Sequence, residues 1–142
     1  MPPTKNPVGL GYWREHPEEE TAEILARIQA TDQRFDGVDG STPNGALSLA
    51  EVAAQLAPGG NMDKVLKEQL LATYFNLATR RINAGTAVAS KTATKLAIHN
   101  VREAALVARQ VLLLLVISPN RPLYSDGTTA LDEINNNKSE AY

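Results

Sequence analysis

The 142-residue chain contains no cysteine. Without thiols it can form neither disulfide bonds nor thiolate zinc sites, and a cysteine nucleophile is excluded as well. The longest uninterrupted apolar run, Val111–Ile117, has seven residues, whereas a membrane-spanning helix needs about 20. The first residues also lack the apolar core of a signal peptide. We therefore expect no membrane span and a domain held together by packing alone.

Aromatic residues are scarce, at 5% of the chain, and there is a single tryptophan. The core must therefore be built from aliphatic side chains, and the sequence is rich in alanine and leucine. These side chains lose little conformational freedom in a helix, so the composition favours helices. With 43% hydrophobic and 21% charged residues, the chain has the balance of an ordinary globular protein. Its length suits one domain.

The net charge of −2 is unevenly distributed along the chain. Residues 1–60 contain nine acidic and four basic residues, a balance of −5. Residues 61–120 contain three acidic and eight basic residues, a balance of +5, and the remainder contributes −2. A nucleic-acid-binding domain is usually strongly basic as a whole. We therefore expect no nucleic-acid partner.

Capped segments with helical periodicity recur along the chain, and strand signals are few. Pro17 suits the first turn of a helix, Ser48 and Glu51 have the spacing of a capping box, and Asn61 can cap a further segment. These signals predict five helices, at residues 17–31, 48–57, 62–84, 89–117 and 128–135. The predicted fold class is all-α, a compact bundle of about five helices with two long central ones.

The helix predicted at 62–84 carries two apolar stripes, one through Leu66 and the other through Leu71. A helix that is apolar on two sides is packed by neighbours on both, so this helix should be central. An Asp126-Gly127 turn is expected before the last helix. The predicted organisation is an irregular arm at 1–10, a single helical domain at 11–136 and a disordered tail at 137–142.

The only tryptophan, Trp13, and one of the two histidines, His16, lie directly before Pro17. An indole face and an imidazole there could contact a ligand. Alternatively, Trp13 buries a large apolar area and anchors an otherwise loose arm, while His16 occupies the start of the following helix. We favour the second interpretation, in which Trp13 and His16 are structural anchors.

No catalytic residue is predicted. The sequence has no Gly-x-Ser-x-Gly elbow, no phosphate-binding loop and no dinucleotide fingerprint. Two histidines, His16 and His99, are too few for a zinc site without thiolates. The acidic run Glu18–Glu20 is interpreted as the first turn of a helix, where the helix dipole favours negative charge. We expect no enzyme, and an active site near Trp13 and His16 is the least favoured alternative.

The loop that begins at Asp36 is dense in turn residues and oxygen donors. Counted back from Glu51, a twelve-residue calcium loop would place Leu47 and Gly45 where an EF-hand requires an apolar residue and a glycine. Its first position falls on Gly40, which has no side-chain oxygen. The alternative is a turn that leads into a capping box. The calcium ligands predicted by the first interpretation are Asp36, Asp39, Thr42, Asn44 and Glu51.

Basic residues of the helix predicted at 89–117 fall within about 40° of one another on a helical wheel. Apolar residues lie on the same side. Such a face is either a solvated basic surface or a docking strip for an acidic, partly apolar protein partner. The docking interpretation requires Leu106 to be exposed. The predicted partner surface consists of Lys91, Lys95, Ile98, Arg102, Leu106 and Arg109.

Three stretches of the sequence carry a resemblance to a known class of domains. They are Gly-Tyr-Trp-Arg-Glu-His-Pro at residues 11–17, the run Leu70–Ala78, and the run Leu131–Asn136. The first is similar to the Gly-Tyr-Trp-Lys-Asn-His-Pro opening of an uncharacterised class of helical domains in bacterial secreted and surface proteins. The other two are similar to its central helix and its closing segment. Arg14 and Glu15 depart from the usual Lys-Asn pair.

The resemblance implies an extracellular accessory or interaction module, and it carries no catalytic residue over to this chain. The loop and helix before the central helix, at residues 36–57, also depart from the apolar segment usual in that class. We therefore expect a non-catalytic interaction or spacer module of an extracellular or surface protein. The alternative is a calcium-stabilised binding module that uses residues 36–51. No other cofactor is expected.

Overall fold

The computed structural model describes residues 6–114 and 121–136. Within these ranges the chain forms helices only, which confirms the all-α class. An isolated antiparallel bridge between Ala87 and Asn100 is the one strand-like pairing of the described residues. The α-helices are α1 (Leu10–Glu15), α2 (Ala22–Thr31), α3 (Leu49–Leu56), α4 (Met62–Ala78), α5 (Lys91–Lys95), α6 (Val101–Leu114) and α7 (Arg121–Asn135). Two 3₁₀ helices are η1 (Pro17–Glu19) and η2 (Gln33–Phe35).

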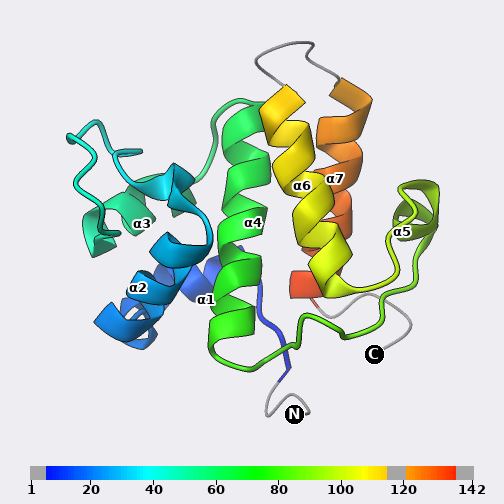
Figure 1. Ribbon diagram of the computed structural model, residues 1–142, viewed down its shortest axis with the longest axis horizontal. Coiled ribbons are helices and arrows are strands. Elements are labelled where there is room, and N and C mark those ends of the chain that lie inside the picture. The colour runs from blue at the N-terminus through cyan, green and yellow to red at the C-terminus, as the bar shows by residue number, and fades with distance from the viewer. Residues whose placement is uncertain (1–5, 115–120, 137–142) are drawn as a thin grey trace.

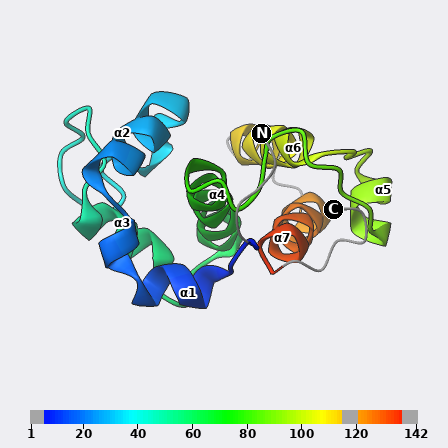
Figure 2. The ribbon, with the colours of Figure 1, turned by 90° about the horizontal axis from the view of Figure 1, so that it is seen from below.

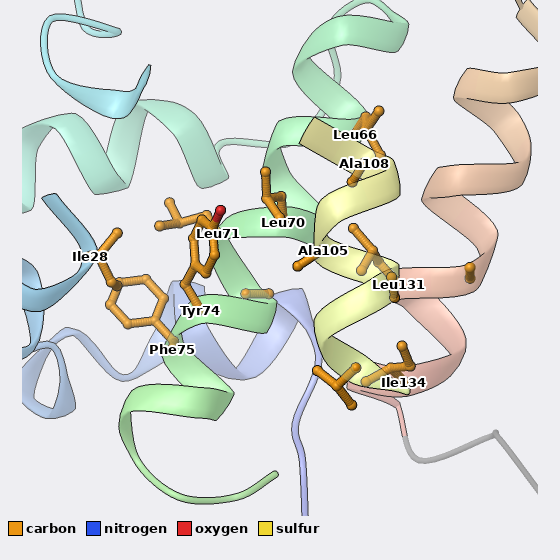
Figure 3. Packing of buried hydrophobic residues seen from close by; sticks show 14 of the residues in the cluster. Ile28, Leu66, Leu70, Leu71, Tyr74, Phe75, Ala105, Ala108, Leu131 and Ile134 are labelled. Atoms are coloured by element: carbon orange, nitrogen blue, oxygen red, sulfur yellow. The ribbon is translucent and has the colours of Figure 1, made fainter. Parts of the chain in front are cut away.

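Helix α4 lies at the centre of the molecule, as its two apolar stripes predicted. Helices α1, α2 and α3 pack on one side of it, and α6 and α7 pack on the other (Figure 1, Figure 2). Residues 68–76 are all buried. In Figure 3, Phe75 lies beside Ile28 of α2, while Leu66 lies beside Ala108 of α6. One helix therefore joins both halves of the core.

Helix α4 ends well before Gly85, so the predicted end at residue 84 is wrong. Arg80 has a left-handed backbone conformation with φ of 60°. The Arg81 N–H then bonds back to the Asn76 carbonyl at 2.9 Å, which closes a Schellman motif. Glycine usually supplies this conformation because it has no Cβ. A rule that looks for glycine at the helix end therefore placed this one too late.

The single long helix predicted at 89–117 is also wrong, because α5 and α6 are separate helices. Ala97, with φ of 57°, ends α5 in the same way, and the Ile98 N–H donates to the Ala93 carbonyl at 2.8 Å. Asn100 then starts α6, its side-chain oxygen accepting a hydrogen bond from the Glu103 N–H at 2.9 Å. The break turns Ile98 into the core, where it is 3% exposed.

The predicted helix 17–31 is divided as well. Pro17 opens only the 3₁₀ turn η1, and α2 begins after Thr21, whose hydroxyl accepts a hydrogen bond from the Ile24 N–H at 3.4 Å. Residues 6–9 are non-helical, but Leu10, which was predicted to belong to the irregular N-terminal arm, is the first residue of α1. The first five residues of that arm lie outside the described part of the chain.

Asp126 and Gly127 lie inside α7, so the turn predicted there is wrong. Gly127 is buried, and a Cβ at this position would lie 3.5 Å from a methyl group of Leu66. Packing against α4 therefore outweighs the low helix propensity of glycine. The tail predicted to be disordered, at 137–142, lies outside the described residues. Within the described ranges, no helix is both long and apolar enough to cross a membrane.

Candidate binding site

Trp13 is 1% exposed and joins α1 to the central helix. Its ring stacks on Phe75 of α4 with centroids 5.0 Å apart, and Tyr12 meets it edge-on at 5.3 Å. Trp13 is therefore buried between α1 and α4, where an anchor of the N-terminal segment would have to lie, and its anchoring role stays a prediction. His16 directly precedes η1, and its Nδ1 lies 2.8 Å from the Tyr12 carbonyl oxygen. Its ring stacks on that of Tyr12, and its role as a structural anchor stays a prediction.

Hydrogen bonds among Arg81, Glu19 and Tyr12 hold η1 against α1. The Arg81 guanidinium lies 3.3 Å from Glu19 Oε1 and 3.1 Å from the Tyr12 hydroxyl oxygen. The Tyr12 hydroxyl in turn donates to the Glu19 carboxylate. This hydrogen bond is the main reason that the pKa of Glu19 is lowered, and Arg81 adds to the effect. Glu19 is therefore held as an ionised carboxylate with both oxygens engaged.

His16, Glu18 and Glu19 could each offer one ligand atom within 4.8 Å of the others, and no other such group occurs among the described residues. His16 Nδ1 and Glu19 are already hydrogen-bonded within the protein. Glu18 is exposed. We therefore treat this group as part of the hydrogen-bonded contact between η1 and α1, and not as a metal site.

A pocket of about 300 Å³ lies beside Trp13, between the N-terminal segment and α3. Its wall is mostly apolar and includes the faces of Leu49, Val52 and Leu56 on α3. Trp13 closes one side of it. The complete lining is Trp13, Arg14, Pro17, Glu20, Leu49, Val52, Ala53, Leu56, Ala57 and Pro58.

Two polar atoms in the residues of this wall have no hydrogen-bond partner. One is the indole Nε1 of Trp13, and the other is Oε2 of Glu20. Both side chains are buried, and Glu20 is only 4% exposed. A buried polar group without a partner is costly, and a buried charge is more so. These two atoms are therefore the strongest indication of a ligand site in the described part of the chain.

Burial raises the pKa of Glu20 to about 7, and the charges of Glu18 and Glu19 add to this rise. The chain directs Glu20 inward because the residue stands between two short elements. It is the C-cap residue directly after η1, and Thr21 after it caps α2. The interpretation of Glu18–Glu20 as a helical first turn is wrong, since α2 begins later. No pattern in the sequence distinguished Glu20 from its two exposed or half-exposed neighbours.

The pKa of Glu20 predicts a pH dependence of stability. Its value in the folded protein, about 7, lies above the ordinary 4.5. The unfolded chain therefore loses this proton first, and stability falls as pH rises from about 4.5 to above 7. The difference corresponds to about 3 kcal/mol. Glu20→Gln should raise the melting temperature at pH 8.5 and leave it unchanged at pH 4.5.

The control for this measurement is Glu18→Gln, since Glu18 belongs to the same acidic run but is exposed. We expect this control to change the melting temperature little at either pH. Equal melting temperatures for wild type and Glu20→Gln at pH 8.5 would mean that Glu20 is not a desolvated acid.

A larger hollow, of about 640 Å³, lies between α2 and the loop at 36–47. Its carboxylate, Asp36, accepts hydrogen bonds from the backbone N–H groups of Asn44 and Gly45 at 3.1 and 2.7 Å. The unpartnered atom in its wall is the neutral Oε1 of Gln29. The pocket beside Trp13 holds an ionisable group without a partner, so it is the better candidate despite its smaller size.

The carboxylates of the predicted calcium loop accept hydrogen bonds from backbone N–H groups and do not converge on one point, as the ligands of an ion would. Asp39 accepts from the Ser41 N–H at 3.0 Å. Glu51 accepts from the Ser48 N–H at 2.8 Å and from the Gly37 N–H. Ser48 and Glu51 form the reciprocal bonds of a capping box, which the alternative interpretation predicted.

The remaining predicted ligands, Thr42 and Asn44, are exposed, and the Asn44 side chain accepts from the Ala46 N–H at 3.0 Å. Among the described residues, Asp36, Asp39 and Glu51 do not form a group close enough to share one ion. Calcium binding by this loop stays a prediction, and melting curves in calcium and in chelator would test it.

The predicted partner surface is not one continuous face, because Lys91 and Lys95 lie on α5 while Arg102 and Arg109 lie on α6. Ile98, between the two helices, is buried, so its place on an exposed strip is wrong. Two of the basic residues are paired, Lys95 Nζ with Asp126 at 2.9 Å and Arg109 Nε with Asp32 at 3.7 Å.

Leu106 of α6 is 46% exposed, as the docking hypothesis required. Leu113 on the same helix is 69% exposed. Arg102 precedes Leu106 by one helical turn and is also exposed. These residues form a smaller exposed face than the one predicted, and a partner for it stays a prediction.

The described residues form an all-α domain with a mostly apolar pocket beside Trp13, whose wall includes Arg14 and Glu20. No protein-family model, no curated protein and no solved structure matches this chain. The three stretches that carry the resemblance to the bacterial surface domains do come together in space. Trp13 stacks on Phe75, and Asn76 is hydrogen-bonded to Asn135. Membership of that class stays a prediction.

Proposed function

We propose that this domain is a non-catalytic protein-interaction module, and that the pocket beside Trp13 receives a side chain of the partner. The observation that carries this proposal is the pair of unpartnered polar atoms, Trp13 Nε1 and Glu20 Oε2, in residues that wall an otherwise apolar pocket. Binding sites commonly combine apolar walls with a few polar groups that fix the orientation of the ligand.

The geometry around the two histidines supports a role without catalysis. Nδ1 of His16 contacts a backbone carbonyl, and the ring is stacked on Tyr12. His99 lies on the exposed link between α5 and α6, where its Nδ1 is 2.9 Å from Glu103. Neither lines the pocket. The extracellular or surface setting that we propose rests on the sequence resemblance alone.

Trp13 makes the proposal directly measurable, because it is the only tryptophan of the chain and it lines the pocket. The probes are single amino acids blocked as N-acetyl methylamides, namely those of leucine, norleucine, glutamine, glutamate and lysine. We expect at least one of them to change the Trp13 fluorescence in a saturable manner. Such small ligands are expected to bind in the millimolar range, since each atom contributes little.

A pair of matched variants tests whether the response comes from this pocket. Ala53 lines it and is exposed, so Ala53→Leu should fill the pocket without disturbing the core and should abolish the response. Ala50 is exposed on the same helix but outside the pocket, so Ala50→Leu should respond like wild type. The proposal fails if no probe gives a saturable response, or if Ala53→Leu responds as wild type does.

A further inference from the structure

We propose that the side chain received by this pocket is a lysine of the partner, with its alkyl stem along the apolar wall and its ammonium group on Glu20. This inference rests on the proposed function and deepens it. A lysine side chain has the two properties that the pocket requires. Its unbranched stem is apolar, and the end of the stem carries a positive charge.

The apolar part of the wall suits a stem of methylene groups. Trp13, Val52 and Leu56 are buried residues of the core, so their positions are fixed before any ligand arrives. Pro17 and Pro58 complete the wall with rigid rings. A preformed wall reduces the entropic cost of binding, because few side chains must be ordered.

The charge of the pocket selects a cation. Oε2 of Glu20 has no partner, although the side chain is buried. The nearest positive charge of the wall, Arg14, is engaged elsewhere, since its Nε donates to the Leu56 carbonyl and its guanidinium lies 3.5 Å from Glu68. An arriving ammonium group would therefore give Glu20 the ion pair that the protein itself does not supply.

The neighbours of Glu20 strengthen this preference. Glu18 and Glu19 precede it in the chain, and the charges of both make the electrostatic potential around its carboxyl group more negative. Residues of α3 in the pocket wall are uncharged. A carboxylate or phosphate would meet repulsion here, and a neutral apolar side chain would leave Glu20 without a partner.

The peptide backbone that accompanies a lysine residue offers a further match. An ammonium group donates hydrogen bonds but accepts none. The Nε1–H of Trp13, a residue of the pocket wall, is buried and has no acceptor in the protein, and the peptide carbonyl of a lysine residue is an acceptor of the kind that it lacks. A lysine within a polypeptide therefore carries both a donor for Glu20 and an acceptor for Trp13, whereas a free alkylamine carries only the donor.

The experiment compares blocked lysine with blocked norleucine, which has the same kind of stem but no ammonium group, by Trp13 fluorescence. At pH 8 we expect blocked lysine to bind at least about tenfold more tightly than blocked norleucine, as hydrogen bonds to charged groups contribute on this scale. Glu20→Gln should remove this preference, and Glu18→Gln should retain most of it. Pentylamine should bind more weakly than blocked lysine.

The pH dependence separates a cationic from a neutral ligand. Lysine stays protonated far above neutral pH, so its affinity should rise as Glu20 ionises near its pKa of about 7. Arg14, Glu18 and Glu19 are the charged groups around Glu20, and His16 lies close by in the chain. If the rise persists in Glu20→Gln, another of these groups causes it and the proposal is wrong.

The failure of this inference is distinguishable from the failure of the proposed function. If blocked norleucine or blocked glutamine binds as tightly as blocked lysine, the pocket accepts a side chain but does not select a cation. The inference then falls and the proposed function stands. If pentylamine binds and blocked lysine does not, a polypeptide lysine is excluded. If nothing binds, both proposals fall together.

Discussion

Replacing Asn135 by leucine should lower the free energy of unfolding by about 4 kcal/mol or more, since each buried polar group left without a partner costs roughly 1–3 kcal/mol. Asn135 is the last residue of α7 and is completely buried. Its amide nitrogen donates to the backbone and side-chain oxygens of Gln69 at 3.1 and 3.0 Å. Its amide oxygen accepts from Thr73 at 3.2 Å and from Asn76 at 2.9 Å.

The network continues to the N-terminal segment, because Asn76 also exchanges two hydrogen bonds with the backbone of Val8, at 2.9 and 3.0 Å. Leucine has the branched shape of asparagine but a larger volume, so it makes none of these hydrogen bonds and leaves no room for water to make them. The matched control is Asn136→Leu, at the next position, which is exposed. Urea denaturation would contradict the prediction if both variants unfolded at the same midpoint.

Trp13→Ala should cost about 3–5 kcal/mol, which is the range for removing a fully buried large aromatic side chain. The ring is 1% exposed and stacks on Phe75 of the central helix. Its loss removes the anchor of α1 and opens the wall of the proposed pocket. The melting temperature, followed by circular dichroism, should fall by about 10 °C or more for a domain of this size.

Trp13→Phe is the matched variant, because it keeps an aromatic ring against Phe75 and removes only part of the apolar area. We expect it to cost less than half as much as the alanine replacement. A loss below about 0.5 kcal/mol for Trp13→Ala, the range of ordinary surface changes, would mean that the ring is not an anchor. The alternative function of Trp13 as an exposed ligand contact would then be favoured.

The failures of sequence-based prediction share one physical origin at the helix ends. Arg80 and Ala97 both have positive φ, a conformation that is unfavourable for residues with a Cβ. The fold selects it because the chain must turn there so that Ile82 and Ile98 can be buried. Rules built on glycine describe what the backbone prefers locally, and they contain no information on which turns the core requires.

The candidate site was hidden from the sequence for a related reason. Glu18, Glu19 and Glu20 are identical side chains in consecutive positions, yet one is exposed, one is paired with Arg81, and one is buried without a partner. The difference arises from Arg81 and α3, which lie far along the chain. Likewise, Asn135 was predicted only as the end of the last helix, and its burial depends on the residues of α4 that it meets.

By itself the sequence determined the all-α class, the central place of α4, the capping box of Ser48 and Glu51, and the burial of Trp13. Each of these depends on apolar periodicity, on a cap or on one large side chain, all of which act over a few residues. The tertiary structure alone decided where α4 and α5 end, that Glu20 is desolvated, and that Asn135 is fully hydrogen-bonded. Desolvation and long-range hydrogen bonding depend on segments that meet only after folding, so no local pattern encodes them.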